Sequence, residues 1–431
     1  MTSDNSFSRH LSLPAIFVSF KAPGFKLFYL ANTFASVDMN VRMAVHGWLV
    51  LELTDDSAVW LGIYALTLGM GQFIFSMLAG AIVDRFQRRN VLLIEGTLSA
   101  LMALGLTVAI FYEVAGLWTA LSLALVIGCL RAVRFTAVNR FVYDLVGPRQ
   151  LVNGVSLWRF SSAPMMIFGA LLVGALIEWF DIWAAYGFMG ISLTIALPFL
   201  ALIRVTGAAE KSNTNIMRQT VEGIKYAISN QSLRTLFTIS IVMESLGFAF
   251  LVMIPVMAKN VLEAGPIGMG LLQAGVGAGM VISTLVMASR GDSENKPRVI
   301  FLNALIAGIA LIGFAVSRSL VVSIFFAAVV MGFLNAYDLT LGALMQLVAP
   351  SNFRGRAVSL HSLAISFTAI GGFFMGIVGS VIGVPVILAA GGTGILINSL
   401  LRRPALIRIQ RHQQQLSVEP TQEGSVSEDS D

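Results

Sequence analysis

The chain has 431 residues, of which 56% are hydrophobic and 12% are charged, and its formal net charge is +5. This composition is typical of membrane proteins with many spans and excludes a chain built of soluble domains. The single cysteine, Cys129, excludes an intramolecular disulfide.

Long apolar runs occur along almost the whole chain. Runs of roughly 18 to 20 residues can cross a bilayer as helices. Twelve such helices are expected at residues 27–53, 58–83, 91–112, 117–138, 153–177, 182–203, 233–257, 266–289, 299–316, 320–345, 357–378 and 381–401. Because a span in lipid must satisfy its backbone hydrogen bonds internally, the expected fold class is an all-α membrane protein with twelve transmembrane helices.

Lysine and arginine are distributed unevenly among the connections. Of the 28, all except Arg42, Lys259 and Arg318 lie in the two tails or in the even-numbered connections with their adjoining helix ends. The positive-inside rule then places both termini and the even connections in the cytoplasm, with the spans in the inner membrane. The positive net charge reflects this topology, so a nucleic-acid partner is not expected.

The two halves of the sequence share short segments. Residues 145–148 (Leu-Val-Gly-Pro) recur as residues 347–350 (Leu-Val-Ala-Pro), and each copy is followed by a Val-Ser-Leu segment. Two parallel, pseudo-symmetric six-helix bundles with a substrate path between them are a transporter architecture. The expected organisation is a cytoplasmic N-terminal segment (1–26), an N-terminal bundle (27–205), a cytoplasmic linker with an amphipathic helix (206–232), a C-terminal bundle (233–401) and a disordered cytoplasmic tail (402–431).

The connection between the second and third expected helices combines cations with one carboxylate. Its characteristic residues are Gly80, Asp84, Arg85, Arg88 and Arg89. A carboxylate at a helix end can accept backbone N–H groups from the N-terminus of another helix, and the arginines can pair with acids such as Asp144 or Glu95. The segment is expected to form a cytoplasmic gate. The alternative is that its charges anchor the connection in the anionic headgroup layer.

This pattern resembles the loop signature of the major facilitator superfamily, although Gln87 stands where that family usually has glycine. Residues 47–54, 140–148 and 350–356 are similar to segments of its bacterial twelve-helix efflux branch, carriers similar to the enterobactin exporter. The resemblance implies secondary transport by alternating access. It also implies that the N-terminus of the eleventh helix is the partner of Asp84.

Three ionisable residues follow one another at intervals of four along the first expected helix. Asp38, Arg42 and His46 therefore lie on one stripe of that helix. Ionisable side chains inside a membrane are costly unless they are paired or face a cavity. Either Asp38 is a proton site tuned by Arg42, or the two form an ion pair that neutralises itself. His46 either relays protons or is structural.

Other polar residues are expected along the substrate path. Glu244 lies near the centre of the seventh helix, where it either couples protons or contacts substrate, or else pairs with Arg131 or Arg42. Asp338 and Asn335 of the tenth helix and Arg131 of the fourth could line the same path.

Together these patterns predict a proton-coupled antiporter that exports an amphipathic small molecule of the drug or siderophore type. Without a phosphate-binding loop or a His/Cys cluster, no metal or other cofactor is expected and the protein is not expected to be an enzyme. Its expected partners are the small-molecule substrate, protons and membrane lipid, and we expect a monomer. Bulky residues follow Pro164 in the fifth helix, where antiporters of the superfamily commonly carry paired glycines. This departure bears on the direction of transport, and a proton-coupled importer of a polar solute or a lysophospholipid flippase is the alternative carrier. An alternative of another class is a non-transporting membrane sensor or assembly partner, against which the carboxylates inside the spans argue.

Overall fold

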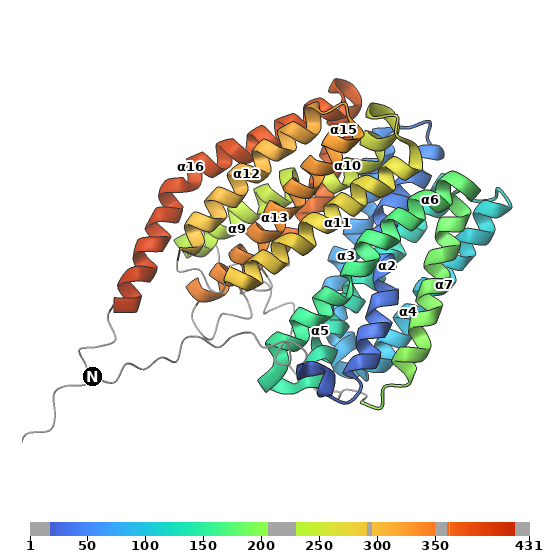
Figure 1. Ribbon diagram of the computed structural model, residues 1–431, viewed down its shortest axis with the longest axis horizontal. Coiled ribbons are helices and arrows are strands. Elements are labelled where there is room, and N and C mark those ends of the chain that lie inside the picture. Colours follow the sequence, from blue (N-terminus) through green and yellow to red (C-terminus); the bar gives the residue numbers. More distant parts are fainter. Residues whose placement is uncertain (1–17, 206–229, 291–294, 350–359, 362, 419–431) are drawn as a thin grey trace, which may run out of the picture. The chain divides into compact units, whose positions relative to one another are not determined.

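The computed structural model describes residues 18–205, 230–290, 295–349, 360–361 and 363–418. This part of the chain forms helices with short connections and contains no strand (Figure 1). Eleven helices among these residues are long and apolar enough to cross a membrane. The twelfth span is α2 (Phe25–Glu52), whose 28 residues give a length of about 42 Å, more than a bilayer core requires. The expected all-α membrane fold is confirmed.

The chain divides into two compact units. Unit 1 comprises Met1–Ile216 and Ile254–Ala274, and unit 2 comprises Met217–Met253 and Gly275–Asp431. Residues 254–274 were expected in the C-terminal bundle, yet they pack with unit 1. Close approach of backbones explains this packing, because a Cβ added to Gly174 would lie 2.7 Å from the carbonyl oxygen of Pro266.

Unit 1 is built from long helices that follow the expected spans. They are α2, α3 (Ala58–Arg85), α4 (Arg88–Phe111), α5 (Leu117–Ser161), α6 (Ala170–Phe180) and α7 (Ile182–Ala201), together with the short helices η1 (Val18–Lys21) and η2 (Met165–Gly169). α5 extends beyond the expected fourth span and is kinked at Gly147, whose φ of 70° favours glycine. α3 and α5 pack closely because Gly128 lies against the backbone of Leu68, whose oxygen would be 2.1 Å from an added Cβ.

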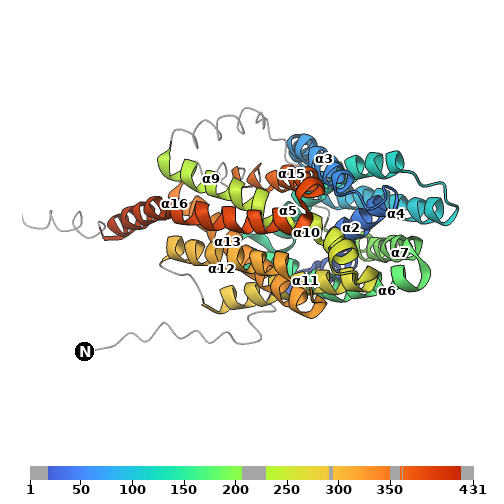
Figure 2. The ribbon, with the colours of Figure 1, turned by 90° about the horizontal axis from the view of Figure 1, so that it is seen from above.

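The described helices of unit 2 run along a common direction (Figure 2). The seventh span, whose residues from Ile254 on belong to unit 1, is a series of short helices: α9 (Gln231–Met243), η3 (Glu244–Phe248), α10 (Phe250–Val256) and η4 (Met257–Val261). The later spans are α11 (Gly265–Arg290), α12 (Lys296–Val316), α13 (Leu320–Val348), α15 (Phe367–Ile382) and α16 (Val384–Val418). η3 and η4 are π-helices, and η3 contains Glu244. The expected amphipathic helix of the linker and the start of the eleventh helix lie outside the described residues.

The C-terminal helix is longer than expected. α16 continues to Val418, so the expectation of a disordered tail from residue 402 is wrong for residues 402–418. The reason is packing, since Leu406 and Ile409 are buried and the Gln410 amide donates a hydrogen bond to the Asn295 side chain. Residues 419–431 lie outside the described part.

Candidate functional site

The connection between α3 and α4 is held by charged contacts with α5. Arg88 is buried, and its Nη1 donates to both oxygens of Asp144, at 2.6 and 2.8 Å. Asp84 forms an ion pair with Arg140 of α5. Charge-assisted contacts of this kind are stronger than those between neutral groups. The end of α3 and the start of α4 are therefore tied to the part of α5 that precedes its kink at Gly147.

Two of the arginines expected in the gate, Arg88 and Arg89, have partners within unit 1. The pairing of Arg88 with Asp144 is one of the pairings expected from the sequence, and Arg89 donates to the carbonyl oxygen of Ile203 at 2.8 Å. Arg85 is exposed at the end of α3. For this residue, anchoring in the anionic headgroup layer fits the structure as well as a role in the gate does. The partner expected for Asp84, at the start of the eleventh helix, lies outside the described residues.

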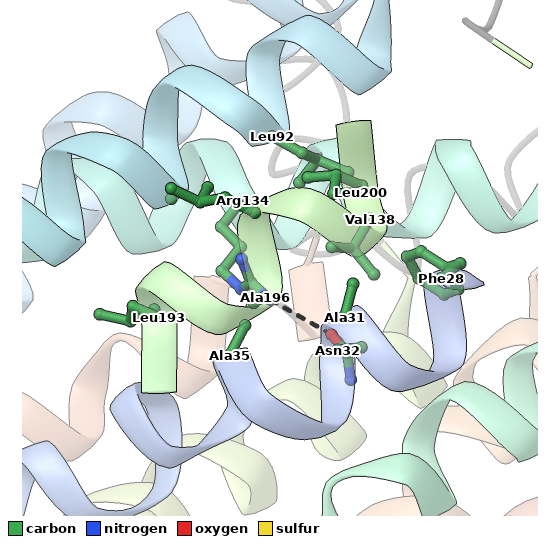
Figure 3. Close-up of a pocket in the computed structure, with 12 residues that line it drawn as sticks. Phe28, Ala31, Asn32, Ala35, Leu92, Arg134, Val138, Leu193, Ala196 and Leu200 are labelled. Atoms are coloured by element: carbon green, nitrogen blue, oxygen red, sulfur yellow. Dashed lines mark hydrogen bonds between the residues drawn. The ribbon is translucent and has the colours of Figure 1, made fainter. Parts of the chain in front are cut away.

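A small cavity lies inside unit 1 between α2, α4, α5 and α7 (Figure 3). Its polar lining consists of Arg134 and Asn32, where the arginine Nη2 donates to the amide oxygen at 3.3 Å. Arg134 also pairs with the buried Glu95 at 3.0 Å, and Asn32 donates to Ser161 at 2.8 Å. Buried charges that are paired and hydrogen-bonded in this way stabilise one arrangement of the helices. This network is therefore complete without a ligand.

The stripe on α2 contains an ion pair. Arg42 is buried with 3% exposure and pairs with Asp38 one turn earlier. Arg131 on α5 interacts electrostatically with both residues and with Tyr64. Asp38, Arg42 and Arg131, which the sequence predicted along the substrate path, therefore interact with one another in the structure. The buried Tyr64, which the sequence did not indicate, belongs to the same group.

His46 is held on both ring nitrogens. Its Nε2 lies 3.0 Å from the carbonyl oxygen of Ala120, and its Nδ1 lies 2.7 Å from the hydroxyl of Tyr186. The ring also stacks on Tyr64 with a centroid separation of 4.9 Å. Because a fully buried imidazole with both nitrogens engaged has no free site for a passing proton, this geometry favours the structural interpretation.

Unit 2 contains a cluster of two carboxylates and a histidine. Glu244 is buried in η3 and accepts a hydrogen bond from the hydroxyl of Thr368. His361 Nε2 lies 3.1 Å from Asp338 on α13, and both groups interact electrostatically with Glu244. Tyr337, fully buried beside Asp338, interacts electrostatically with the same two acids. The arrangement can hold or exchange protons in an otherwise apolar interior.

His361 was missed by sequence reasoning. The signal was available, because it is an ionisable residue in an apolar stretch, which marks a functional candidate in a membrane span. Asn335, by contrast, is buried and donates to Ser283 at 2.8 Å and Thr284 at 3.0 Å of α11. That amide connects α13 to α11. Among the described residues, no group of three His, Cys, Asp or Glu side chains could hold a metal ion.

A further set of contacts joins residues 254–274 to the rest of unit 1. Lys259 pairs with Asp56 at 2.6 Å and lies over the ring of Trp48. Trp48 Nε1 in turn donates to Glu52 at 2.6 Å. These contacts hold the segment against the C-terminal end of α2 and the connection that follows it.

Long apolar helices in two units, a charged α3–α4 connection and ionisable groups inside the spans define a membrane transporter of the major facilitator type. The match to known families is more specific. The chain belongs to the transmembrane secretion effector family, which it matches over residues 15–431.

Two curated relatives cover most of the chain. The enterobactin exporter of Shigella flexneri is 21% identical over 395 residues, covering 91% of this chain and 94% of the relative. The staphyloferrin A transporter of Staphylococcus aureus is 23% identical over 371 residues, covering 83% and 88%. The family and these relatives are transporters rather than enzymes.

Solved structures share the fold. A POT peptide transporter bound to alafosfalin has a TM-score of 0.71 and 13% identity, covering 93% of this chain and 99% of its own. A bacterial homologue of the human lysosomal transporter Spinster has a TM-score of 0.64 and 13% identity, covering 93% and 98%. At these identities the likeness concerns the fold alone.

Proposed function

We propose that the protein is a proton-coupled antiporter that exports a siderophore-type small molecule across the inner membrane by alternating access. The observation that carries the proposal is the cluster of Glu244, Asp338 and His361 in unit 2. The names of the two relatives, an enterobactin exporter and a staphyloferrin A transporter, support the substrate class.

The chemistry of the cluster favours coupling to protons. Glu244 is 4% exposed and its described partner is a neutral hydroxyl. Keeping a carboxylate charged at such a buried position is costly, and a bound proton removes that cost. His361 beside Asp338 offers a second group that changes charge near neutral pH. A substrate that displaces a proton from this cluster would couple its own export to proton entry.

The proposal also includes the topology of the chain, its oligomeric state and its cytoplasmic gate. Both termini face the cytoplasm, in accordance with the positive-inside rule, and the protein acts as a monomer. Asp84, Arg88 and their neighbours then lie on the cytoplasmic side, where the ion pairs with Arg140 and Asp144 hold the end of α3 and the start of α4 against α5. In this proposal the segment with Gly80, Asp84, Arg85, Arg88 and Arg89 forms the gate on that side.

The test uses the purified full chain in proteoliposomes with a pH indicator inside. Iron-free enterobactin, staphyloferrin A, lipophilic cations and neutral drugs are added one at a time. Wild type is compared with Glu244→Gln, His361→Asn, Asp38→Asn and, as a control for removing an acid, Glu113→Gln in the exposed α4–α5 connection.

Substrate-triggered proton movement that is lost in Glu244→Gln or His361→Asn and kept in Glu113→Gln is the expected result. Loss in Asp38→Asn would make the α2 pair a second coupling site. Substrate movement with the same internal pH in all five proteins would reject proton coupling. Accumulation of a polar solute in the direction of proton flow would replace export with import.

A further inference from the structure

We infer that unit 1 carries a binding site for an anionic group of the substrate, formed by Arg131 with Arg42. The substrate is accordingly an oxyanion-bearing molecule, such as a carboxylate. This inference rests on the proposal that the protein carries a small molecule, and it specifies the charge of that molecule.

The first step is the balance of charge inside unit 1. Apart from His46, five aspartate, glutamate and arginine side chains lie well inside its described spans, and two arginine–carboxylate pairs account for four of them: Asp38 with Arg42, and Glu95 with Arg134. The fifth is Arg131. It forms no ion pair or hydrogen bond with any other residue that the structure describes. One positive charge is therefore left without a matching carboxylate in this unit.

The second step is the position of that charge. Arg131 is the fifteenth residue of α5, about 21 Å along a helix from its start, and Asp38 lies about 20 Å along α2. Both are near the middle of a span. Arg131 is partly buried and interacts with Asp38, Arg42 and Tyr64. Its surroundings are therefore the interior of the protein.

The third step concerns hydrogen-bond donors. Arg42 is 3% exposed, and its Nη1 is buried without a hydrogen-bond partner in the described part of the chain. Asp38 pairs with Arg42 alone, so this carboxylate leaves the Nη1 donors of Arg42 unused and does not neutralise Arg131. Buried polar groups are almost always hydrogen-bonded in native proteins. A bound molecule with hydrogen-bond acceptors would therefore supply the partner that these arginine donors lack.

The fourth step is the chemistry that fits. Guanidinium groups present planar N–H donors that match the two oxygens of a carboxylate or phosphate. An anion bound here would neutralise the unmatched charge and satisfy the free donors together. Tyr64, stacked on the fixed ring of His46, interacts electrostatically with Arg131. The site therefore fits the carboxylate or phosphate group of a small molecule.

The test measures binding rather than transport, using the full-length protein in detergent. Three acids are each compared with a neutral analogue of the same shape: 2,3-dihydroxybenzoate with its amide, citrate with its trimethyl ester, and octanoate with its amide. Thermal shift and calorimetry give the dissociation constants for wild type, Arg131→Gln, Arg131→Lys and Arg318→Gln. Arg318 is an exposed arginine in the α12–α13 connection and serves as the matched control.

We expect wild type and Arg318→Gln to bind at least one acid roughly 10- to 100-fold more tightly than its neutral analogue. Arg131→Gln should lose this preference, and Arg131→Lys should keep part of it because the charge is retained. The inference is overturned if neutral analogues bind as well as the acids, if the preference persists in Arg131→Gln, or if wild type binds none of the acids at millimolar concentration.

The two proposals fail separately in these experiments. Acid-selective binding without any proton movement in proteoliposomes would refute proton coupling and leave the anion site standing. Proton-coupled transport with equal binding of acids and neutral analogues would refute the anion site and leave the antiporter standing.

Discussion

The ion pair between Arg88 and Asp144 gives a quantitative prediction about stability. Arg88 is 6% exposed, and its Nη1 lies 2.6 and 2.8 Å from the two carboxylate oxygens. Asp144→Ala leaves this buried guanidinium without its anion, which typically costs about 3 kcal/mol or more. For a unit of this size, that loss corresponds to a fall of roughly 6–12 °C in the thermal midpoint. The midpoint can be followed by fluorescence of the protein in detergent.

The double variant tests whether the loss comes from the pair itself. When Arg88→Ala is combined with Asp144→Ala, no buried charge remains unpaired, so the double variant should be less destabilised than the sum of the single variants. The exposed Glu113→Gln serves as a control and should leave the midpoint unchanged. A loss below about 1 kcal/mol in Asp144→Ala would match an ordinary surface ion pair and refute the structural role assigned to this contact.

Two further predictions concern packing in unit 1. Gly128→Ala places a methyl group 2.1 Å from the backbone oxygen of Leu68, so it should lower the thermal midpoint strongly, whereas Gly105→Ala, with open space around it, should not. His46→Phe keeps the stacked ring but leaves the hydroxyl of Tyr186 and a carbonyl oxygen without their partner. It should cost about 1–3 kcal/mol in stability while leaving substrate-triggered proton movement intact; a specific loss of proton movement in a stable variant would instead assign His46 to the relay.

The sequence was sufficient to predict features that depend on the local spacing of residues or on the free energy of transferring apolar side chains into lipid. The spans follow directly from apolar length, because a bilayer accepts no other backbone structure for such runs. Asp38 and Arg42 are paired because residues four apart lie on the same face of a helix. Arg88 and Asp144 were also anticipated as partners, since both lie at helix ends that the connections bring to one side.

Features that depend on tertiary packing could not be predicted from the sequence. His361 and Asp338 come from different helices, and no local pattern fixes which faces of those helices meet. The π-helix at Glu244 depends on the helices around it: Gly371 lies so close to Ser245 that a Cβ would be 2.1 Å from its backbone oxygen. The assignment of residues 254–274 to unit 1 likewise depends on close glycine contacts between distant segments.

The length of α16 has a practical consequence for shortening the protein. Its 35 residues extend about 52 Å, well beyond a hydrocarbon core of roughly 30 Å. α16 lies along α12 within unit 2 (Figure 1). A chain ended at Leu401, where hydropathy alone would end the last span, would lose Leu406 and Ile409 and expose the apolar surface that they cover. Truncations meant for purification or crystallisation should therefore retain the helix at least through Gln410.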